Sequence, residues 1–327
     1  MKNPEAKLSI CVMTYNHNNY IEQCLFGIVN QKTRFPIKVV IGDDISNDGT
    51  TEKCKKIEND YPDIVEHYIS SGSKNPTIES AENNLKEKLK YCSGEYIAIC
   101  EGDDYWTDLY KLQKQVDFLD THPEAAGCFT DATTVNENGS LLTTQYYSAD
   151  QDYYSQKDCL KKLRSSYATC TLVFRKSVLD GEWPLWLHSK LCDEFLDLHI
   201  TSKGLLAYLP DNTAAYRIHS RGIWQGNSSI WRNKEMIGRY EMLISDDHMK
   251  EKYEDILTEY IVKHIQSLLS DQGCSIIDAH RYFIKLIRYY PIKQMSDILK
   301  CLDFYFIGTV RFSPIKLFLN VNSRKIT

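Results

Sequence analysis

Short apolar runs alternate with amphipathic stretches through the first hundred residues of the chain. The apolar runs cover residues 8–13, 37–42, 64–69 and 95–100, and stretches with helical spacing cover residues 20–31, 50–59 and 81–91. Strands that alternate with helices form parallel βαβ units, because each helix returns the chain to the same end of the sheet. The pattern predicts an α/β fold with a mostly parallel sheet flanked by helices.

Polar side chains follow three of these predicted strands at the point where each strand ends. They form three clusters, which are Thr14, Tyr15 and Asn16, then Asp43 and Asp44, then Asp103 and Asp104. Ligands of open parallel sheets bind beyond the carboxyl ends of the strands. We therefore expect the three clusters to share one edge of the sheet and to form a binding site there.

Asp103 and Asp104 follow an apolar run directly and are the most informative pair in the chain. Two adjacent carboxylates repel each other, and an oxygen-preferring divalent cation removes that repulsion while keeping coordination positions for substrate phosphates. The alternative is an ordinary solvated turn, in which Asp is common. The pair alone does not decide between the two interpretations.

Composition narrows the class of protein. With 327 residues, 43% of them hydrophobic, the chain is long enough for a full α/β core and additional helices. A net charge of −5 argues against general nucleic-acid binding. The cysteines include no CxxC pair and are predicted to be core residues in a reducing cytoplasm. The sequence contains no signal peptide and no run of ~18 apolar residues, so we expect a protein that is neither exported nor membrane-spanning.

The pattern becomes less regular after Asp104. A helix is predicted over residues 109–121 and strands over residues 125–130 and 169–174, and the tyrosine-rich stretch 145–154 is predicted to line a substrate groove.

Helical spacing returns beyond residue 230, over residues 234–244, 253–269 and 276–289. We therefore predict two domains, residues 1–228 and a helical C-terminal region of residues 229–327. Residues 301–320 mix aromatic side chains with Arg311 and Lys316. Packing against the main domain is the favoured interpretation of that segment, and contact with a membrane surface is the alternative.

The polar clusters also resemble a known family. The second cluster continues with Ser46, Asp48, Gly49 and Thr50, and residues 93–98 precede Asp103 and Asp104. In this order and spacing, about residues 8–226 resemble the family 2 glycosyltransferases of the GT-A fold, which transfer a sugar from a nucleotide diphosphate to an acceptor. The resemblance implies a Rossmann-like nucleotide-diphospho-sugar transferase domain and, with it, bacterial polysaccharide or glycan assembly.

The resemblance implies a nucleotide site at the first two clusters. Thr14, Tyr15 and Asn16 would border the nucleotide, with the Tyr15 ring stacked on a uracil and the Asp44 carboxylate accepting from the ring N–H. Loop packing is the alternative for Tyr15. Asp48 and Gly49 suit a tight turn and a helix cap, so a structural role is preferred for both.

The resemblance also assigns Asp103 and Asp104 to Mn²⁺ or Mg²⁺, which would bridge the two donor phosphates. His219 would complete the metal shell or donate to a phosphate, and Arg217 or Arg221 would face the diphosphate oxygens with its forked donors. A purely structural role is the alternative for His219.

A carboxylate is still required to take the proton of the acceptor hydroxyl. Inverting members of the family use an Asp of an acidic element that opens a helix after the acceptor loop. The resemblance, aligned by hydrophobic spacing, implies that role for Asp193, and Glu194 is the alternative because the match can slip by one residue. Capping of a helix N-terminus by Asp193, worth ~0.3–1 kcal/mol, is the structural interpretation and is compatible with catalysis.

The chain departs from the family in one motif. Many members carry an Ala-Arg-Asn triplet before the fourth strand, whereas this chain has Glu82, Asn83 and Asn84, so Asn84 would substitute for one phosphate or sugar contact. The absence of a transmembrane bundle from the sequence favours a single-addition transferase over a processive synthase.

These observations predict an inverting, metal-dependent transferase that passes a sugar, UDP-linked in the first place, to a glycan or lipid-linked saccharide. It would be cytoplasmic, with peripheral contact at the inner face of the membrane. A sugar nucleotidyltransferase should have a Gly-rich basic loop, and residues 14–19 contain neither Gly nor Lys. A glycoside hydrolase would use two carboxylates about 5–9.5 Å apart and no nucleotide. The third alternative is a non-catalytic glycan-binding or nucleotide-sugar-binding protein with the same fold.

Overall fold

The computed structural model describes residues 5–70, 78–161, 167–222 and 224–290. These residues form two compact units, one that ends at His219 and one that begins at Ser220. The two-domain division after residue 228 stays a prediction.

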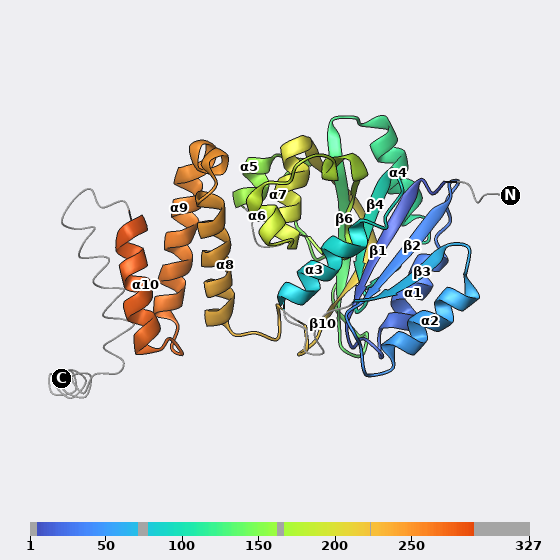
Figure 1. The fold of residues 1–327 in the computed structure, drawn as a ribbon, viewed down its shortest axis with the longest axis horizontal. Helices are drawn as coiled ribbons and strands as arrows, with labels where there is room; N and C mark the ends of the chain where they lie inside the picture. Colours follow the sequence, from blue (N-terminus) through green and yellow to red (C-terminus); the bar gives the residue numbers. More distant parts are fainter. Residues whose placement is uncertain (1–4, 71–77, 162–166, 223, 291–327) are drawn as a thin grey trace. The chain divides into compact units, whose positions relative to one another are not determined.

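Ten strands among the described residues form one sheet in the first unit (Figure 1). Seven of them are β1 (Leu8–Thr14), β2 (Ile37–Asp43), β3 (Val65–Ile69), β4 (Tyr96–Glu101), β6 (Ala125–Asn136), β9 (Val173–Arg175) and β10 (Leu205–Ile218). The short strands are β5 (Tyr105–Trp106), β7 (Leu141–Thr143) and β8 (Tyr153–Tyr154). The order is β3-β2-β1-β4-β9-β6-β10-β5, with β7 beside β6 and β8 beside β10.

The long strands all run in one direction. β1 is parallel to β2 and β4, and β2 is parallel to β3. β9 is antiparallel to both β4 and β6, so those two strands point the same way, and β10 is parallel to β6. The carboxyl ends of β1, β2, β4, β6 and β10 therefore meet at one edge of the sheet. The predicted α/β class with a mostly parallel sheet is confirmed.

Helices cover both faces of the sheet, which explains why β1 and β4 are mostly apolar. They are α1 (Ile21–Val29), α2 (Thr50–Asp60), α3 (Ile78–Leu89), α4 (Lys111–Thr121), α5 (Gln156–Lys161), α6 (Leu185–Ser189) and α7 (Asp193–Lys203). In Figure 1, α3 and α5 to α7 lie on one side of the sheet, and α1, α2 and α4 lie on the other. Ile10, Val12 and Ala98 are fully buried between these layers.

The strand predicted over residues 169–174 is wrong in its first half. Thr169–Thr171 form a 3-10 turn, and only Val173–Arg175 pair with the sheet, as β9. The turn forms because the Thr171 N–H and hydroxyl both donate to the Ala168 carbonyl, at 2.8 and 2.7 Å. The strand predicted over residues 125–130 is longer than expected, because pairing with β10 continues to Asn136.

The tyrosine-rich stretch was expected to line a groove, but two of its rings are in the interior. Tyr147 and Tyr154 are 6% and 3% exposed and lie 5.3 and 5.8 Å from the Phe129 ring, which also stacks on Tyr167 at 4.1 Å. Burial against one another lowers the free energy of these aromatic side chains more than exposure to water would. They therefore form a small aromatic cluster beside the main core.

The second unit is helical where it is described. It contains α8 (Ser229–Ile244), α9 (Asp247–Ser270) and α10 (Ile276–Tyr289), which agree with the three predicted helices. Ser228, Asp246 and Ser275 each cap a helix N-terminus by accepting a backbone N–H. No helix among the described residues is long and apolar enough to cross a membrane. The segment 301–320, predicted to pack or to touch a membrane, lies outside the described residues.

The core of the first unit contains a buried lysine with a shifted pKa. Lys111, at the start of α4, is fully buried and donates to Gln115 Oε1 at 2.6 Å and to the Thr171 carbonyl at 3.3 Å. Its ammonium group lies 4.5 Å from the centre of the Trp106 ring. Burial lowers the pKa of Lys111 to about 8, because the interior disfavours the charged form.

The lowered pKa of Lys111 predicts that the protein becomes more stable as the pH rises above about 8. Above pH 8 the folded protein releases the Lys111 proton, while the unfolded chain keeps it until about pH 10.5. The unfolded state then binds more protons, so the free energy of unfolding rises with pH across that window and is independent of this group below it. Urea unfolding at several pH values should reveal the rise in the wild type and not in Lys111→Met.

Lys114→Met is the matched control, because Lys114 bridges Asp108 and Asp211 at the surface. Those carboxylates raise the pKa of Lys114. The contribution of Lys114 to the free energy of unfolding is therefore lost at high pH, whereas that of Lys111 is gained. Identical pH profiles for the wild type and Lys111→Met would contradict the prediction.

Candidate active site

The loops after β1 and β2 are tied together. The Asn16 N–H donates to Ser46 Oγ at 2.9 Å, and the Asn47 N–H donates to Asn16 Oδ1 at 2.9 Å. A third bond joins the Asn18 N–H to Asp48 Oδ2 at 3.0 Å. Asn16 has a φ of 52°, a left-handed conformation that Asn tolerates better than most residues. The two predicted nucleotide-binding segments therefore form one structure at the sheet edge.

Asp43 and Asp44 differ in their surroundings. Asp43 is fully buried and accepts from the Ser46 N–H at 2.9 Å and from the Thr51 hydroxyl. Burial would raise the pKa of Asp43, but His67, whose Nε2 lies 3.7 Å from Asp43 Oδ2, and the hydrogen bonds from Ser46 and Thr51 outweigh it, and the pKa is lowered. Asp43 thus holds the loop together, and Asp44, whose N–H donates to the Thr14 carbonyl at 2.9 Å, follows it at the edge.

Asp48 and Gly49 have the structural role expected of them. Asp48 Oδ1 accepts from the Thr50 N–H at 3.1 Å and from the Thr50 hydroxyl at 2.6 Å. Gly49 precedes the first residue of α2 with a φ of 102°, which favours glycine.

The β4 loop passes very close to the β1 loop. A Cβ added to Gly102 would lie 2.7 Å from Thr14 Oγ1 and 2.9 Å from His17 Nδ1. Only glycine allows that approach without displacement of its neighbours. The close contact brings the acidic pair that follows Gly102 beside the predicted nucleotide site.

Asp103 faces two histidines. Its Oδ2 atom is 2.9 Å from His219 Nε2 and 3.7 Å from His17 Nε2, and 18% of the side chain is exposed. Burial acts to raise the pKa of Asp103, but His17 and His219 outweigh it and bring the pKa to about 2. Asp103 is therefore an ionised carboxylate at neutral pH.

Asp104 points into the protein. Its side chain is 2% exposed, and Oδ1 accepts the Arg217 N–H at 2.7 Å. Burial and then the neighbouring Asp103 raise the pKa of Asp104 well above its usual range. Glu101 lies in the same acidic group, and its Oε2 atom is buried with no hydrogen-bond partner among the described residues.

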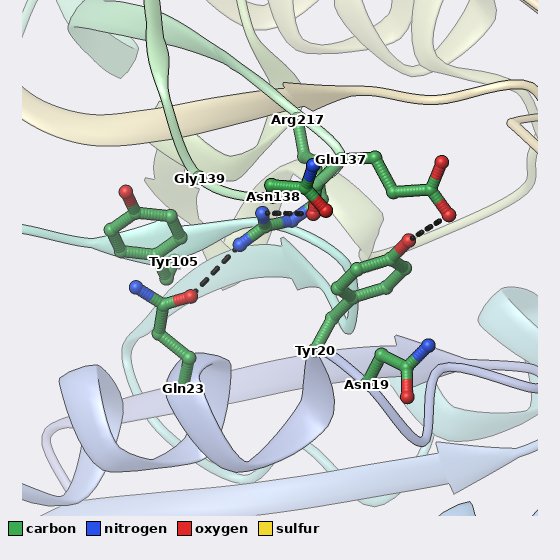
Figure 2. A pocket seen from close by; sticks show the side chains of 8 residues that line it. All are labelled: Asn19, Tyr20, Gln23, Tyr105, Glu137, Asn138, Gly139 and Arg217. Atoms are coloured by element: carbon green, nitrogen blue, oxygen red, sulfur yellow. Dashed lines mark hydrogen bonds between the residues drawn. The ribbon is translucent and has the colours of Figure 1, made fainter.

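Arg217 is held by neutral groups. Its Nε donates to the Asp103 carbonyl at 2.9 Å, and its Nη1 donates to the Asn136 carbonyl at 3.3 Å. Its Nη1 also donates to the Glu137 carbonyl at 3.1 Å, and its Nη2 donates to Gln23 Oε1 at 2.8 Å (Figure 2). Four of the five N–H donors of the guanidinium are thereby engaged within the described residues, and one on Nη2 is left for a ligand.

The predicted base lies at the start of α7. Asp193 is exposed, and its Oδ2 accepts the Thr169 hydroxyl at 3.0 Å. Glu194, the alternative base, is 7% exposed. Burial, then Asp104, Asp193 and Asp103 in that order, raise the pKa of Glu101. Asp193 is therefore electrostatically coupled to the acidic group of the β4 loop.

Two polar or aromatic side chains near the site are internal. Trp106 is 4% exposed and donates its Nε1–H to the Cys170 carbonyl at 2.7 Å, so it packs in the core. Asn84 is 3% exposed, and its Nδ2 donates to the Gly42 carbonyl at 3.3 Å.

The donor set suits a cation that the substrate helps to hold. Within the described ranges, no group of three or more His, Cys, Asp or Glu side chains is arranged to hold a metal ion by itself. Asp103 Oδ2 and His219 Nε2 are 2.9 Å apart, and two adjacent ligands at about 2.1 Å from an octahedral cation are about 3.0 Å apart. The pair fits two coordination positions, and phosphate oxygens and water suit the others.

Sequence reasoning did not identify His17, Tyr20 or Glu101 as part of this site. His17 and Tyr20 lie in the polar stretch after β1, and their rings are 6.4 and 5.3 Å from the His219 ring. Their neighbour is more than 190 residues away in the sequence, so no local pattern marks them. Only Glu101 had a signal in the sequence, because it is an acidic residue two positions before Asp103.

The fold and the site define a nucleotide-sugar-dependent transferase, and comparison with known proteins gives the family. The chain matches Glycosyl transferase family 2 over residues 9–182. An uncharacterized protein of Mycobacterium tuberculosis is 30% identical over 279 residues, which cover 83% of this chain and 78% of that protein. The chain belongs to glycosyl transferase family 2 and is a glycosyltransferase.

A second relative has a named reaction. Escherichia coli WfaP, a UDP-Glc:alpha-D-GlcNAc-diphosphoundecaprenol beta-1,3-glucosyltransferase, is 25% identical over 239 residues, which cover 73% of this chain and 86% of WfaP.

Solved structures share the fold. S. aureus TarS 1-349 in complex with UDP-GlcNAc has a TM-score of 0.57 and 17% identity, with 92% of this chain and 90% of that chain covered. The mannosyltransferase PcManGT from Pyrobaculum calidifontis, in complex with GDP-Man and Mn²⁺, has a TM-score of 0.51 and 16% identity over 94% of this chain and 87% of that chain. With the sheet topology, these likenesses confirm the predicted GT-A fold.

The close approach at Gly102 predicts a destabilising substitution. Gly102→Ala places a methyl group against Thr14 and His17, and we expect a loss of about 1–3 kcal/mol in the free energy of unfolding, measured with urea.

Gly238→Ala is the control for this substitution, because nothing lies within 4 Å of a Cβ at that position in α8. Ala should stabilise this helix by roughly 0.5–1 kcal/mol. A Gly102→Ala protein as stable as the wild type would show that the β1 and β4 loops separate freely.

Proposed function

We propose that this protein is an inverting, metal-dependent glycosyltransferase that moves a sugar from a nucleotide-diphosphate donor, a UDP-sugar in the first place, to a saccharide or lipid-linked saccharide acceptor. One observation carries the proposal: the 2.9 Å pair of Asp103 and His219 lies at the same sheet edge as the joined loops after β1 and β2. A cation at the pair and a nucleotide at the loops would hold the two ends of one donor.

The donor assignment has support from relatives. TarS was crystallised with UDP-GlcNAc, and the named donor of WfaP is UDP-Glc. In this chain, Thr14, Tyr15 and Asn16 would border the nucleotide, and Asp44 would accept from the base N–H. Tyr15 is partly exposed, so its ring is accessible for stacking on a base.

The cation would bind between Asp103, His219 and the donor phosphates. When bound there, Mn²⁺ or Mg²⁺ would neutralise the negative charge that develops on the departing nucleotide diphosphate. Asp104 would act indirectly, because its bond to the Arg217 N–H holds the turn that presents Asp103. The remaining N–H of Arg217 would donate to the donor. The Mn²⁺ bound with GDP-Man in PcManGT supports a divalent cation.

Asp193 would serve as the base. An exposed carboxylate can reach an incoming acceptor, whereas Glu194 is buried. The acceptor hydroxyl would attack the anomeric carbon from the face opposite the diphosphate and give its proton to Asp193 as the bond to the phosphate oxygen breaks. Attack from that face inverts the configuration at the anomeric carbon.

The acceptor of WfaP is linked to diphosphoundecaprenol, which supports a lipid-linked acceptor here. Such an acceptor would bring the protein to the inner face of the cell membrane as a peripheral protein.

Donor binding should depend on a metal. Calorimetric titration of the wild type with UDP should give binding with Mn²⁺ and at least tenfold weaker binding, about 1.4 kcal/mol, after EDTA treatment. Asp103→Asn should lose the metal dependence, because it removes an ionised ligand. The exposed Asp60→Asn at the end of α2 is the control and should bind like the wild type. A UDP affinity that is the same with Mn²⁺ and after EDTA treatment would refute the role of the metal. The absence of binding of any nucleotide would refute the donor site.

Loss of the base should remove turnover but not donor binding. With a synthetic GlcNAc-diphospho-lipid as acceptor and UDP-Glc or UDP-GlcNAc as donor, Asp193→Asn should release UDP about 10²–10⁴-fold more slowly than the wild type. Its UDP affinity should be unchanged. Glu194→Gln should keep most of the activity, and the reverse order of the two variants would transfer the role to Glu194.

A further inference from the structure

A polar pocket lies on the α1 side of the first unit. The beginning of α1, β5, the turn between β6 and β7, and β10 enclose a cavity of about 480 Å³ (Figure 2). Nothing in the proposed transfer reaction uses it, apart from Arg217 on its wall. Its volume is within the range of about 300–1,000 Å³ typical of small-molecule sites.

The walls offer unused hydrogen-bonding groups. The carboxamides of Asn19 and Asn138 are exposed and make no hydrogen bond to any described residue. The Gln23 side chain accepts from Arg217 through Oε1, which leaves its NH₂ group for a ligand. The hydroxyl of Tyr105 likewise has no partner in the described part of the chain. The pocket therefore presents several donors and acceptors within a small volume.

The cation on the wall is rigid and is not neutralised by direct contact. Arg217 is 5% exposed, and its four hydrogen bonds go to three backbone carbonyls and one amide, with no ion pair to a described carboxylate. Its guanidinium carbon lies 4.7 Å from the Tyr20 ring centre and 5.4 Å from the Tyr105 ring centre. The Glu137 carboxylate, which accepts the Tyr20 hydroxyl at 3.1 Å, is on the same pocket.

These groups define the chemistry of the occupant. A small inorganic anion would leave most of the volume empty and would face Glu137. An apolar ligand would remove the exposed amides of Asn19 and Asn138 from water without replacing their hydrogen bonds, at a cost in free energy. A sugar ring has hydroxyl groups that both donate and accept hydrogen bonds. It can therefore pair with the NH₂ donors and with the carbonyl acceptors of the neighbouring carboxamides. It can also place a C–H face against the partly exposed Tyr105 ring.

We propose that this pocket is a second saccharide site, which holds a sugar residue of the glycan on which the enzyme acts. As a site for that glycan, it rests on the proposed transferase function. The pocket is next to the donor site, because Arg217 Nε donates to the Asp103 carbonyl and the Tyr20 ring lies 5.3 Å from that of His219. A glycan held there is kept close to the reaction centre without occupying it.

The test is saturation-transfer NMR on the full chain with UDP and Mn²⁺ present in excess, so that the donor site is filled. The probes are methyl glucoside, methyl N-acetylglucosaminide and methyl glucuronide, each added alone. We expect saturation transfer to at least one probe. A preference for the glucuronide would mean that the positive charge of Arg217 favours a carboxylate in the pocket, and a preference for a neutral probe would mean that hydroxyl groups alone are recognised.

The variants assign the signal to the pocket. Asn19→Ala combined with Asn138→Ala removes two exposed amides that no described residue uses, so the fold should be retained. This double variant should bind the probe at least about tenfold more weakly and bind UDP as the wild type does. Asn59→Ala, which removes an exposed amide from α2, is the matched control and should change neither.

The outcomes separate this proposal from the proposed function. No transfer to any probe, or equal transfer in the double variant, overturns the second site and leaves the donor site intact if UDP still binds. Probe binding that depends on Asn19 and Asn138 in a protein that fails to bind UDP supports the saccharide site and refutes the donor site.

Discussion

The candidate active site at the edge of the sheet depends on one hydrogen bond, from the Arg217 N–H to Asp104 Oδ1. The two residues are 113 positions apart, and their contact joins the loop after β4 to the end of β10. It provides a partner for a buried carboxylate, which would otherwise be costly to bury. It also brings two further groups to the same place, since the Arg217 side chain then reaches the Asp103 carbonyl and His219 reaches the Asp103 carboxylate.

Around that bond the protein concentrates acidic side chains in a poorly solvated region. Glu101, Asp103 and Asp104 lie within four residues of one another, and burial raises the pKa of Glu101 and Asp104. Asp103 stays ionised because His17 and His219 face it. Such a group favours the arrival of positive charge, which is the physical argument for a cation that enters with the donor phosphates. Arg217 contributes a positive charge beside this loop, where its side chain also borders the pocket next to α1.

Much of this arrangement was predictable, because it follows from strand direction. Parallel strands place their carboxyl ends at one edge, so Thr14, Asp44 and Asp103 had to converge once the alternation of strands and helices was recognised. The helices of the second unit were equally visible from their spacing. The 3-10 turn at Thr169–Thr171 was not, because its bonds to Ala168 are local contacts in a segment with a strand-like composition. The burial of Tyr147 and Tyr154 depended on Phe129, which is distant in sequence.

The sequence by itself determined the fold class, the family and the edge at which the site forms, because hydrophobic periodicity and short polar motifs are local properties. Only the tertiary structure decided the separate roles within the acidic pair, since Asp103 turns toward two histidines and Asp104 toward a backbone N–H. It alone brought His17, Tyr20 and Arg217 together and enclosed a pocket between α1 and the turn after β6. The physical reason is that side-chain direction and burial depend on contacts between distant segments, which no single stretch of sequence contains.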